Sequence, residues 1–162
     1  MNGRDRAPSA PLSDELVVLS RAIHGTPELA YQEREAARTI VTLLRRHGHE
    51  VEIPFGGLET AFRARVGPKG PSVALLAEYD ALPEIGHACG HNLIAMSNVG
   101  AFLLAAQRAK ELQVGVELVG TPAEENGGGK IDLLGAGVFR QSVAVLSSHP
   151  GEIGRASCRE RV

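Results

Sequence analysis

The segment SVALLAEY, residues 72–79, decides the fold that we predict for this chain. It is a short, nearly continuous apolar run, which is typical of a strand buried on both faces. Two similar runs follow it, VGVELVG at 114–120 and VAVLSS at 143–148. Helical patterns separate the runs, over Leu93–Glu111 and near Ile131–Leu134. Strands that alternate with helices predict parallel pairing, so we expect an α/β fold with a largely parallel or mixed sheet flanked by helices.

The part of the chain before these runs predicts two helices and two short strands. An N-cap pattern with acidic residues at Leu12–Leu16 indicates a helix that ends near His24-Gly25. The stretch Gln32–Arg46 has the spacing of an amphipathic helix. Val51–Phe55 and Thr60–Val66 are suited to two short strands around a glycine turn.

The length and composition of the chain limit the kinds of protein that it can be. The chain has 162 residues, of which 43% are hydrophobic and 22% charged, and this is typical of one globular domain. A net charge of −2 gives no reason to expect nucleic acid or a membrane as a partner. We find neither a run that could span a bilayer nor an apolar signal core, so we expect a cytoplasmic protein. Two cysteines do not make a disulfide framework, which agrees with a reducing compartment.

Reactive side chains follow each of the three apolar runs. Glu78 and Asp80 end the first run, and HACGH follows at 87–91. TPAEENGGG at 121–129 follows the second run, and SSHPGE at 147–152 ends the third. Because ligands of open α/β sheets bind beyond the carboxyl ends of the strands, we expect these side chains to converge on one site.

The HACGH segment has three interpretations. Cys89 and His91 lie two positions apart around the flexible Gly90, and a thiolate with an imidazole suits zinc or a related divalent ion. Cys89 also precedes a predicted helix, where a thiolate nucleophile is favoured. The third interpretation is an inert buried cysteine at a helix start. His87 is a further ligand candidate by spacing alone.

The remaining candidate residues are Glu124, Glu125, His149 and Asp80, and the case for each is stronger because the others are present. Two neighbouring carboxylates in extended chain point to opposite sides, so Glu124 and Glu125 can divide the roles of general base and metal ligand. A solvated acidic turn is the alternative. His149 ends the third run and is a ligand candidate only together with the other clusters. Asp80 is placed to orient a ligand histidine through a hydrogen bond.

Three long motifs carry a resemblance to a known family. They are AEYDALPEIGHACGHNLIA at 77–95, GTPAEENGGGKIDLLGAGVF at 120–139 and SSHPGE at 147–152. They resemble the zinc-dependent amidohydrolases of the aminoacylase/peptidase-dimerisation family. The most similar branch contains aminobenzoyl-glutamate hydrolase and the β-alanyl-lysine-type dipeptidases.

The resemblance implies a role for each candidate. Cys89 corresponds to a residue that bridges two divalent ions, zinc or manganese. His91, Glu125 and His149 correspond to further metal ligands. Glu124 corresponds to the general base, and Asp80 to the aspartate that orients the site. His87 corresponds to a position that is not known as a ligand.

Two substitutions and the length depart from the family pattern. The usual His-x-Asp motif reads Glu78-Tyr79-Asp80 here, so one usual ligand is absent, and Asn92 replaces a common aspartate. Family members are more than twice as long, with a lid or dimerisation domain and a last histidine ligand outside this chain. We therefore divide the chain into a loose leader at 1–11, a partial catalytic domain at 12–152 and a non-native tail at 153–162. The tail resembles a translated sequencing adapter.

The predicted function is metal-dependent hydrolysis of an amide bond in a small N-acyl amino acid or dipeptide. The resemblance implies this substrate class and a homodimeric full-length protein, while the chain by itself is expected to be inactive or nearly so. The alternative is a non-catalytic metal-binding remnant or an interaction module.

Overall fold

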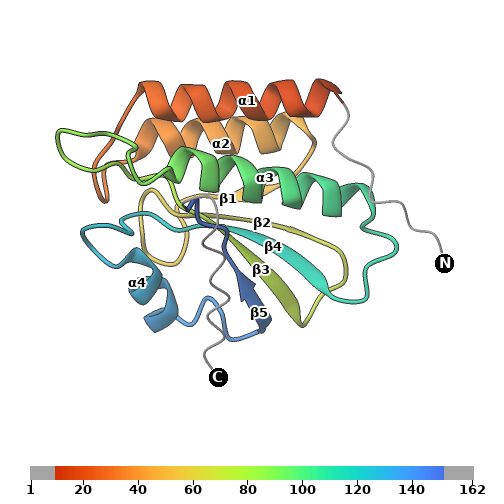
Figure 1. Ribbon diagram of the computed structural model, residues 1–162. Coiled ribbons are helices and arrows are strands. Elements are labelled where there is room, and N and C mark those ends of the chain that lie inside the picture. The colour runs from red at the N-terminus through yellow and green to blue at the C-terminus, as the bar shows by residue number, and fades with distance from the viewer. Residues whose placement is uncertain (1–9, 152–162) are drawn as a thin grey trace.

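The computed structural model describes residues 10–151, which form three layers. Figure 1 shows three helices on one side of a five-stranded sheet and the fourth helix on the other side. The helices are α1 (Ala10–Gly25), α2 (Arg34–Arg46), α3 (His91–Gln107) and α4 (Gly129–Gly135). The strands are β1 (Val51–Glu52), β2 (Phe62–Val66), β3 (Ser72–Ala77), β4 (Gly115–Gly120) and β5 (Ser142–Leu146). The proposed tail and most of the proposed leader lie outside the described residues.

The sheet is mixed, and its strand order is β1-β2-β4-β3-β5. The three strands predicted from the apolar runs are parallel, with β3 between β4 and β5. Leu75 of β3 pairs with Leu118 on one side and with Leu146 on the other. Strands β1 and β2 extend the sheet in antiparallel pairing. The expected α/β fold with a mixed sheet is confirmed.

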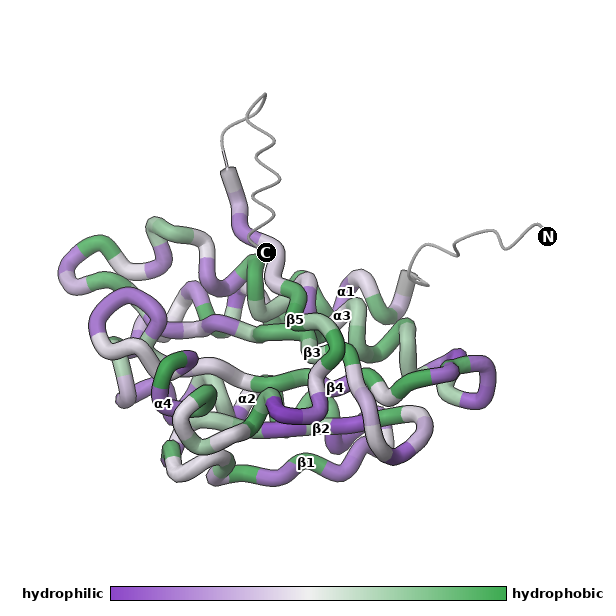
Figure 2. Tube along the Cα trace, turned by 90° about the horizontal axis from the view of Figure 1, so that it is seen from below, coloured by the Kyte–Doolittle hydropathy of each residue, from purple (hydrophilic) through white to green (hydrophobic). Residues whose placement is uncertain are grey.

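Hydrophobic residues pack on both faces of the sheet. The larger cluster lies between the sheet and helices α1, α2 and α3, and includes Leu75 and Leu118. The smaller cluster lies on the α4 side and includes Leu76, Val119 and Leu133. Successive strand residues point to opposite faces, so a strand covered on both sides needs apolar residues throughout. Figure 2 shows hydrophobic residues along β3 and along the edge strand β5.

Several details differ from the sequence prediction. Helix α1 begins at Ala10, so the cap expected at Leu12–Leu16 is wrong. Strand β1 has only two residues, because Pro54 has no N–H to donate and a glycine turn follows. Strand β5 is less buried than its composition indicates, because it is an edge strand, and the side chains of Val143 and Leu146 are exposed.

Helix α3 begins two residues earlier than predicted, and this places His91 in its first turn. Gly90 precedes it with φ of +79°, a left-handed conformation that other residues rarely adopt. A Cβ at this position would lie 2.8 Å from Pro150 Cγ. The glycine in HACGH therefore permits both the turn into α3 and the close approach of the segment after β5.

None of the helices within residues 10–151 is both long enough and apolar enough to cross a bilayer.

Candidate metal centre

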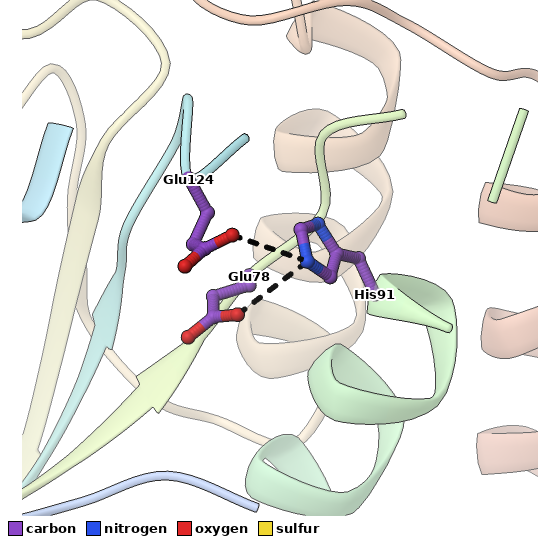
Figure 3. Close-up of side chains that lie close together, drawn as sticks. All are labelled: Glu78, His91 and Glu124. Atoms are coloured by element: carbon purple, nitrogen blue, oxygen red, sulfur yellow. Dashed lines mark ion pairs between the residues drawn. The ribbon is translucent and has the colours of Figure 1, made fainter. Parts of the chain in front are cut away.

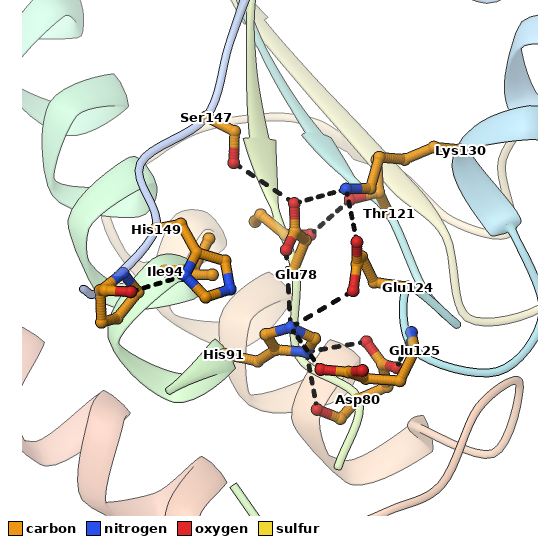
Figure 4. Close-up of polar contacts among 12 residues, drawn as sticks. Glu78, Asp80, His91, Ile94, Thr121, Glu124, Glu125, Lys130, Ser147 and His149 are labelled. Carbon is orange, nitrogen blue, oxygen red and sulfur yellow. Dashed lines mark hydrogen bonds and ion pairs between the residues drawn. The ribbon is translucent and has the colours of Figure 1, made fainter. Parts of the chain in front are cut away.

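The candidate side chains converge beyond the carboxyl ends of β3, β4 and β5 (Figure 4). Glu78 and Asp80 follow β3 directly, and His91 comes from the first turn of α3. Glu124 and Glu125 lie in the loop between β4 and α4, and His149 follows β5. Parallel strands end at the same edge of a sheet, so clusters that are far apart in the sequence meet in one place.

Asp80 fixes one side of the His91 ring. The His91 Nδ1 lies 2.9 Å from the Asp80 backbone oxygen and 3.0 Å from Asp80 Oδ1. The other carboxylate oxygen of Asp80 accepts the backbone N–H of Glu125 at 3.0 Å. When the ring is neutral and its proton is on Nδ1, Nε2 has a free lone pair. This is the tautomer that binds a metal ion through Nε2. One aspartate thus links the histidine to the glutamate loop.

These contacts also determine charge preferences in the absence of a metal ion. Burial is the largest influence on His91 and lowers its pKa, but the hydrogen bond with Asp80 and the nearby carboxylates leave that pKa raised. Burial is also the largest influence on Asp80, and it raises the pKa of this carboxyl group. The contacts with His91 and the Glu125 N–H outweigh burial, so the net effect is a lowered pKa. Without a metal ion, the pair is therefore biased towards imidazolium and carboxylate.

The other side of the His91 ring faces carboxylates without a hydrogen bond. His91 is 1% exposed, and among the described residues its Nε2 has no hydrogen-bond partner. Oxygens of Glu125, Glu78 and Glu124 lie 3.5, 3.6 and 3.7 Å from this nitrogen. Figure 3 shows the Glu78 and Glu124 carboxylates turned towards the ring. Ligand atoms of Glu78, His91 and Glu124 all lie within 4.8 Å of one another.

These separations fit a bound cation better than direct ion pairs. Ligand atoms about 2.1 Å from a tetrahedral zinc ion lie about 3.4 Å apart. The oxygens around His91 Nε2 lie at 3.5 to 3.7 Å, which is longer than a hydrogen bond and close to that spacing. Carboxylates and an imidazole are also the donor types that zinc and manganese accept. The residues present therefore fit a divalent ion.

Cys89 and His149 lie at the border of this cluster. The Cys89 thiol is partly exposed, and a hydrogen bond with the Glu125 carboxylate is the largest of the causes that raise its pKa to about 11. The exposed His149 donates from Nδ1 to the Pro150 oxygen at 2.7 Å, and its ring centroid lies 6.3 Å from that of His91. Both residues line an open cavity of about 560 Å³ beside the cluster. Both expected ligands thus lie near His91, but neither belongs to the group of donor atoms that contains it.

His87 lies on the same cavity but faces another partner. Its ring is 7% exposed and lies 6.2 Å, centroid to centroid, from the ring of His24. Burial is the main cause that lowers its pKa, so the ring is held neutral. It does not belong to the group of donor atoms that contains His91.

Glu78 is a site residue that the sequence places among the converging side chains but to which sequence reasoning assigned no role. The sequence shows it at the end of the first apolar run, where the family pattern makes it only the loss of a histidine ligand. The structure places its carboxylate among the donor atoms that surround His91 Nε2. The signal was available, because a glutamate that ends a buried strand needs a charged partner.

Comparisons with known proteins identify relatives of this chain. No family model matches the chain. The Xaa-Arg dipeptidase of Mus musculus is 43% identical over 154 residues, covering 86% of this chain and 36% of that protein. A p-aminobenzoyl-glutamate hydrolase chain of Escherichia coli is 32% identical over 143 residues, covering 76% of this chain and 30% of the relative.

A solved structure that resembles this chain is also a peptidase. A dinuclear metal-binding peptidase of the M20 family from Bacillus subtilis has a TM-score of 0.77 and 30% identity, covering 85% of this chain and 43% of that chain. The homologues are thus metal-binding peptidases and amidohydrolases. Within this class, the chain belongs to the M20 family, and the resemblance noted in the sequence is confirmed. The chain spans 30–43% of the length of these three proteins.

Proposed function

We propose that the protein hydrolyses an amide bond in a small N-acyl amino acid or dipeptide, with divalent metal ions as cofactors. The observation that carries this proposal is the buried, unpartnered Nε2 of His91, which three carboxylates surround at 3.5 to 3.7 Å. The names of the relatives, a dipeptidase and an aminobenzoyl-glutamate hydrolase, support the substrate class.

In this proposal four residues hold two ions, zinc or manganese. By the family resemblance, Cys89 would hold both ions, and His91, Glu125 and His149 would be further ligands. The ions, when bound, would lower the pKa of a water molecule and polarise the amide carbonyl. Asp80 acts through His91, because it holds Nδ1 and so directs Nε2 into the cluster.

Glu124 is the proposed general base. Its carboxylate would take a proton from the attacking water and later deliver it to the leaving amine. The Glu124 side chain is 34% exposed and the Glu125 side chain 22%, so Glu124 is the more accessible of the two to a substrate. The oxygens of both glutamates lie at similar distances from His91 Nε2, so the division of roles depends on their order in the family motif.

The pKa of Cys89 favours the metal interpretation over the thiol nucleophile. A thiol with a pKa of about 11 is protonated at neutral pH, and the neighbouring Glu125, Glu124 and Asp80 all oppose a thiolate. A nucleophilic cysteine needs the opposite environment. A bound divalent ion would reverse this balance, because metal coordination deprotonates a thiol.

We extend the proposal to the context of the full-length protein. A homodimer follows from the family resemblance. A cytoplasmic location agrees with a composition of only two cysteines in 162 residues.

The proposal is tested first by elemental analysis of the purified chain after zinc or manganese is added and excess ion removed. The unchanged chain should retain metal, and Cys89→Ser and His91→Ala should retain much less. In a version extended to the length of the relatives, Glu124→Gln should abolish dipeptide hydrolysis and leave the metal in place. Turnover that survives Glu124→Gln would show that the base is another residue. A folded chain that takes up no metal would contradict the proposal.

A further inference from the structure

The further inference concerns Glu78, a buried carboxylate that the proposed ligand set does not use. Glu78 is 2% exposed and directly follows the last residue of β3, the middle one of the three parallel strands. A buried glutamate is costly unless its charge is compensated. In the family motif the corresponding position is a histidine ligand, so the function of a glutamate at this point needs an explanation.

The two carboxylate oxygens of Glu78 have different surroundings. Oε1 accepts a hydrogen bond from Lys130 Nζ at 2.8 Å and lies 3.3 Å from the Ser147 hydroxyl, which also donates to it. Oε2 points to the other side and lies 3.6 Å from His91 Nε2 (Figure 4). One oxygen is thus anchored by α4 and the segment after β5, while the other is directed at the buried nitrogen.

Lys130 does not neutralise the cluster by itself. Its Nζ also lies 3.5 Å from Glu124 Oε1, so one cation is shared between two carboxylates. Glu125 and Asp80 add two more carboxylates around the same imidazole. Like charges at this distance repel each other in a partly buried site, and a cation between them removes the repulsion.

The unpartnered His91 Nε2 is the independent sign of where that cation binds. A buried ring nitrogen without a partner is rare and costly in a folded protein. The oxygens of Glu78 and Glu124 lie on the side to which this nitrogen points (Figure 3). The Glu78 oxygen and the His91 nitrogen therefore face a common space, which the Glu124 carboxylate also borders.

We propose that Glu78 is itself a metal ligand, with Oε2 coordinating the ion that His91 Nε2 binds. The inference rests on the metal centre of the proposed function and adds a carboxylate to its ligands. Glu78 takes the place of the imidazole that the His-x-Asp motif supplies. Carboxylates suit manganese well, whereas imidazole suits zinc. Glu78 therefore shifts the preference of this centre towards manganese.

The experiment measures metal affinity in the full 162-residue chain, by competition with a chromophoric chelator for Mn²⁺ and Zn²⁺. Glu78→Gln removes the charged ligand and should weaken binding on the order of 100-fold, because even residues that only support ligands give 10- to 100-fold effects. Glu78→His restores a donor. It should bind Zn²⁺ more tightly relative to Mn²⁺ than the unchanged chain does.

Glu117→Gln is the matched control. Glu117 is 4% exposed, lies on the neighbouring strand β4 and pairs with Arg65 at 2.5 Å, so it is also a buried glutamate with a cationic partner. It lies outside the cluster that contains His91, so its loss should leave metal affinity unchanged. Equal weakening in Glu117→Gln and Glu78→Gln would trace the effect to lost stability and overturn the inference.

The outcomes separate this inference from the proposed function. Metal binding that is lost in His91→Ala but kept in Glu78→Gln overturns the role of Glu78 alone. An unchanged chain that binds neither ion overturns both proposals. If Glu78→Gln does not fold, the visible absorption spectrum of bound Co²⁺ is compared between Glu78→His and the unchanged chain. A changed spectrum supports ligation at this position, and an unchanged spectrum overturns it.

Discussion

At the scale of single residues, Glu33 connects three parts of the chain that lie far apart in the sequence. It is 0% exposed, and its Oε1 accepts the backbone N–H groups of Tyr31 and Ala123 at 3.0 and 2.8 Å. Its Oε2 accepts the Thr60 hydroxyl at 3.0 Å. Ala123 has φ of +57° and directly precedes Glu124. Glu33 therefore helps to hold the loop that carries the two site glutamates.

Replacing Glu33 by alanine should destabilise the protein by about 2–3 kcal/mol, because a buried N–H group, a partly buried N–H group and a buried hydroxyl lose a charged acceptor. The free energy of unfolding in urea measures this effect. Glu59→Ala is the control, since Glu59 forms an exposed ion pair with Arg34 and its loss should cost less than about 1 kcal/mol. Equal costs for the two variants would mean that the buried hydrogen bonds of Glu33 contribute little.

The site residues differ in how far sequence could predict them. His91, Glu124 and Glu125 follow apolar runs in motifs with recognisable spacing, so their convergence was predictable from the ends of parallel strands. Glu33 was not predictable, because glutamate is almost never fully buried and its partners Thr60 and Ala123 are 27 and 90 residues away.

At the scale of elements, the sequence predicted the parallel strands but not their unequal burial. All six residues of β4 are buried, whereas β5 has no fully buried residue. The two apolar runs look alike, and the difference comes from position, because β4 lies inside the sheet and β5 at its edge. Strand order depends on contacts between distant segments, which apolar spacing does not encode.

The start of α2 illustrates the same limit. Arg34 is its first residue, and the cap is not supplied by the neighbouring residue. The carboxylate of Glu28 accepts the N–H groups of Glu35 and Ala36 at 3.1 and 2.9 Å. A cap that reaches over seven or eight residues is not found by local cap rules.

The unequal burial of β4 and β5 predicts unequal effects of one substitution. Val119 in β4 is 0% exposed and Val145 in β5 is 46% exposed. Val119→Ala should cost about 2 kcal/mol, from two lost methyl groups and a residual cavity, whereas Val145→Ala should cost less than about 1 kcal/mol. Urea unfolding of both variants measures the difference. A cost for Val145→Ala as large as that for Val119→Ala would indicate that β5 is covered in solution.

At the scale of the whole molecule, the proposed metal centre lies where separate layers of the fold meet. Glu78 follows β3, His91 begins a helix on one face, and Lys130 belongs to the helix on the other face. Carboxylates from two strand ends gather around one imidazole. Without a bound cation this arrangement carries electrostatic repulsion, so the stability of the fold should depend on the metal ion.

Zinc or manganese should therefore raise the melting temperature of the chain. An ion at 100 times its dissociation constant adds about 2.7 kcal/mol of stability, which corresponds to about 5–10 °C for a domain of this size. Calorimetry with and without the ion measures the shift, and a chelator should reverse it. His91→Ala is the control, because it removes the nitrogen that the carboxylates surround. A shift of the same size in His91→Ala would place the stabilising ion elsewhere on the molecule, because this substitution leaves the surface charges unchanged.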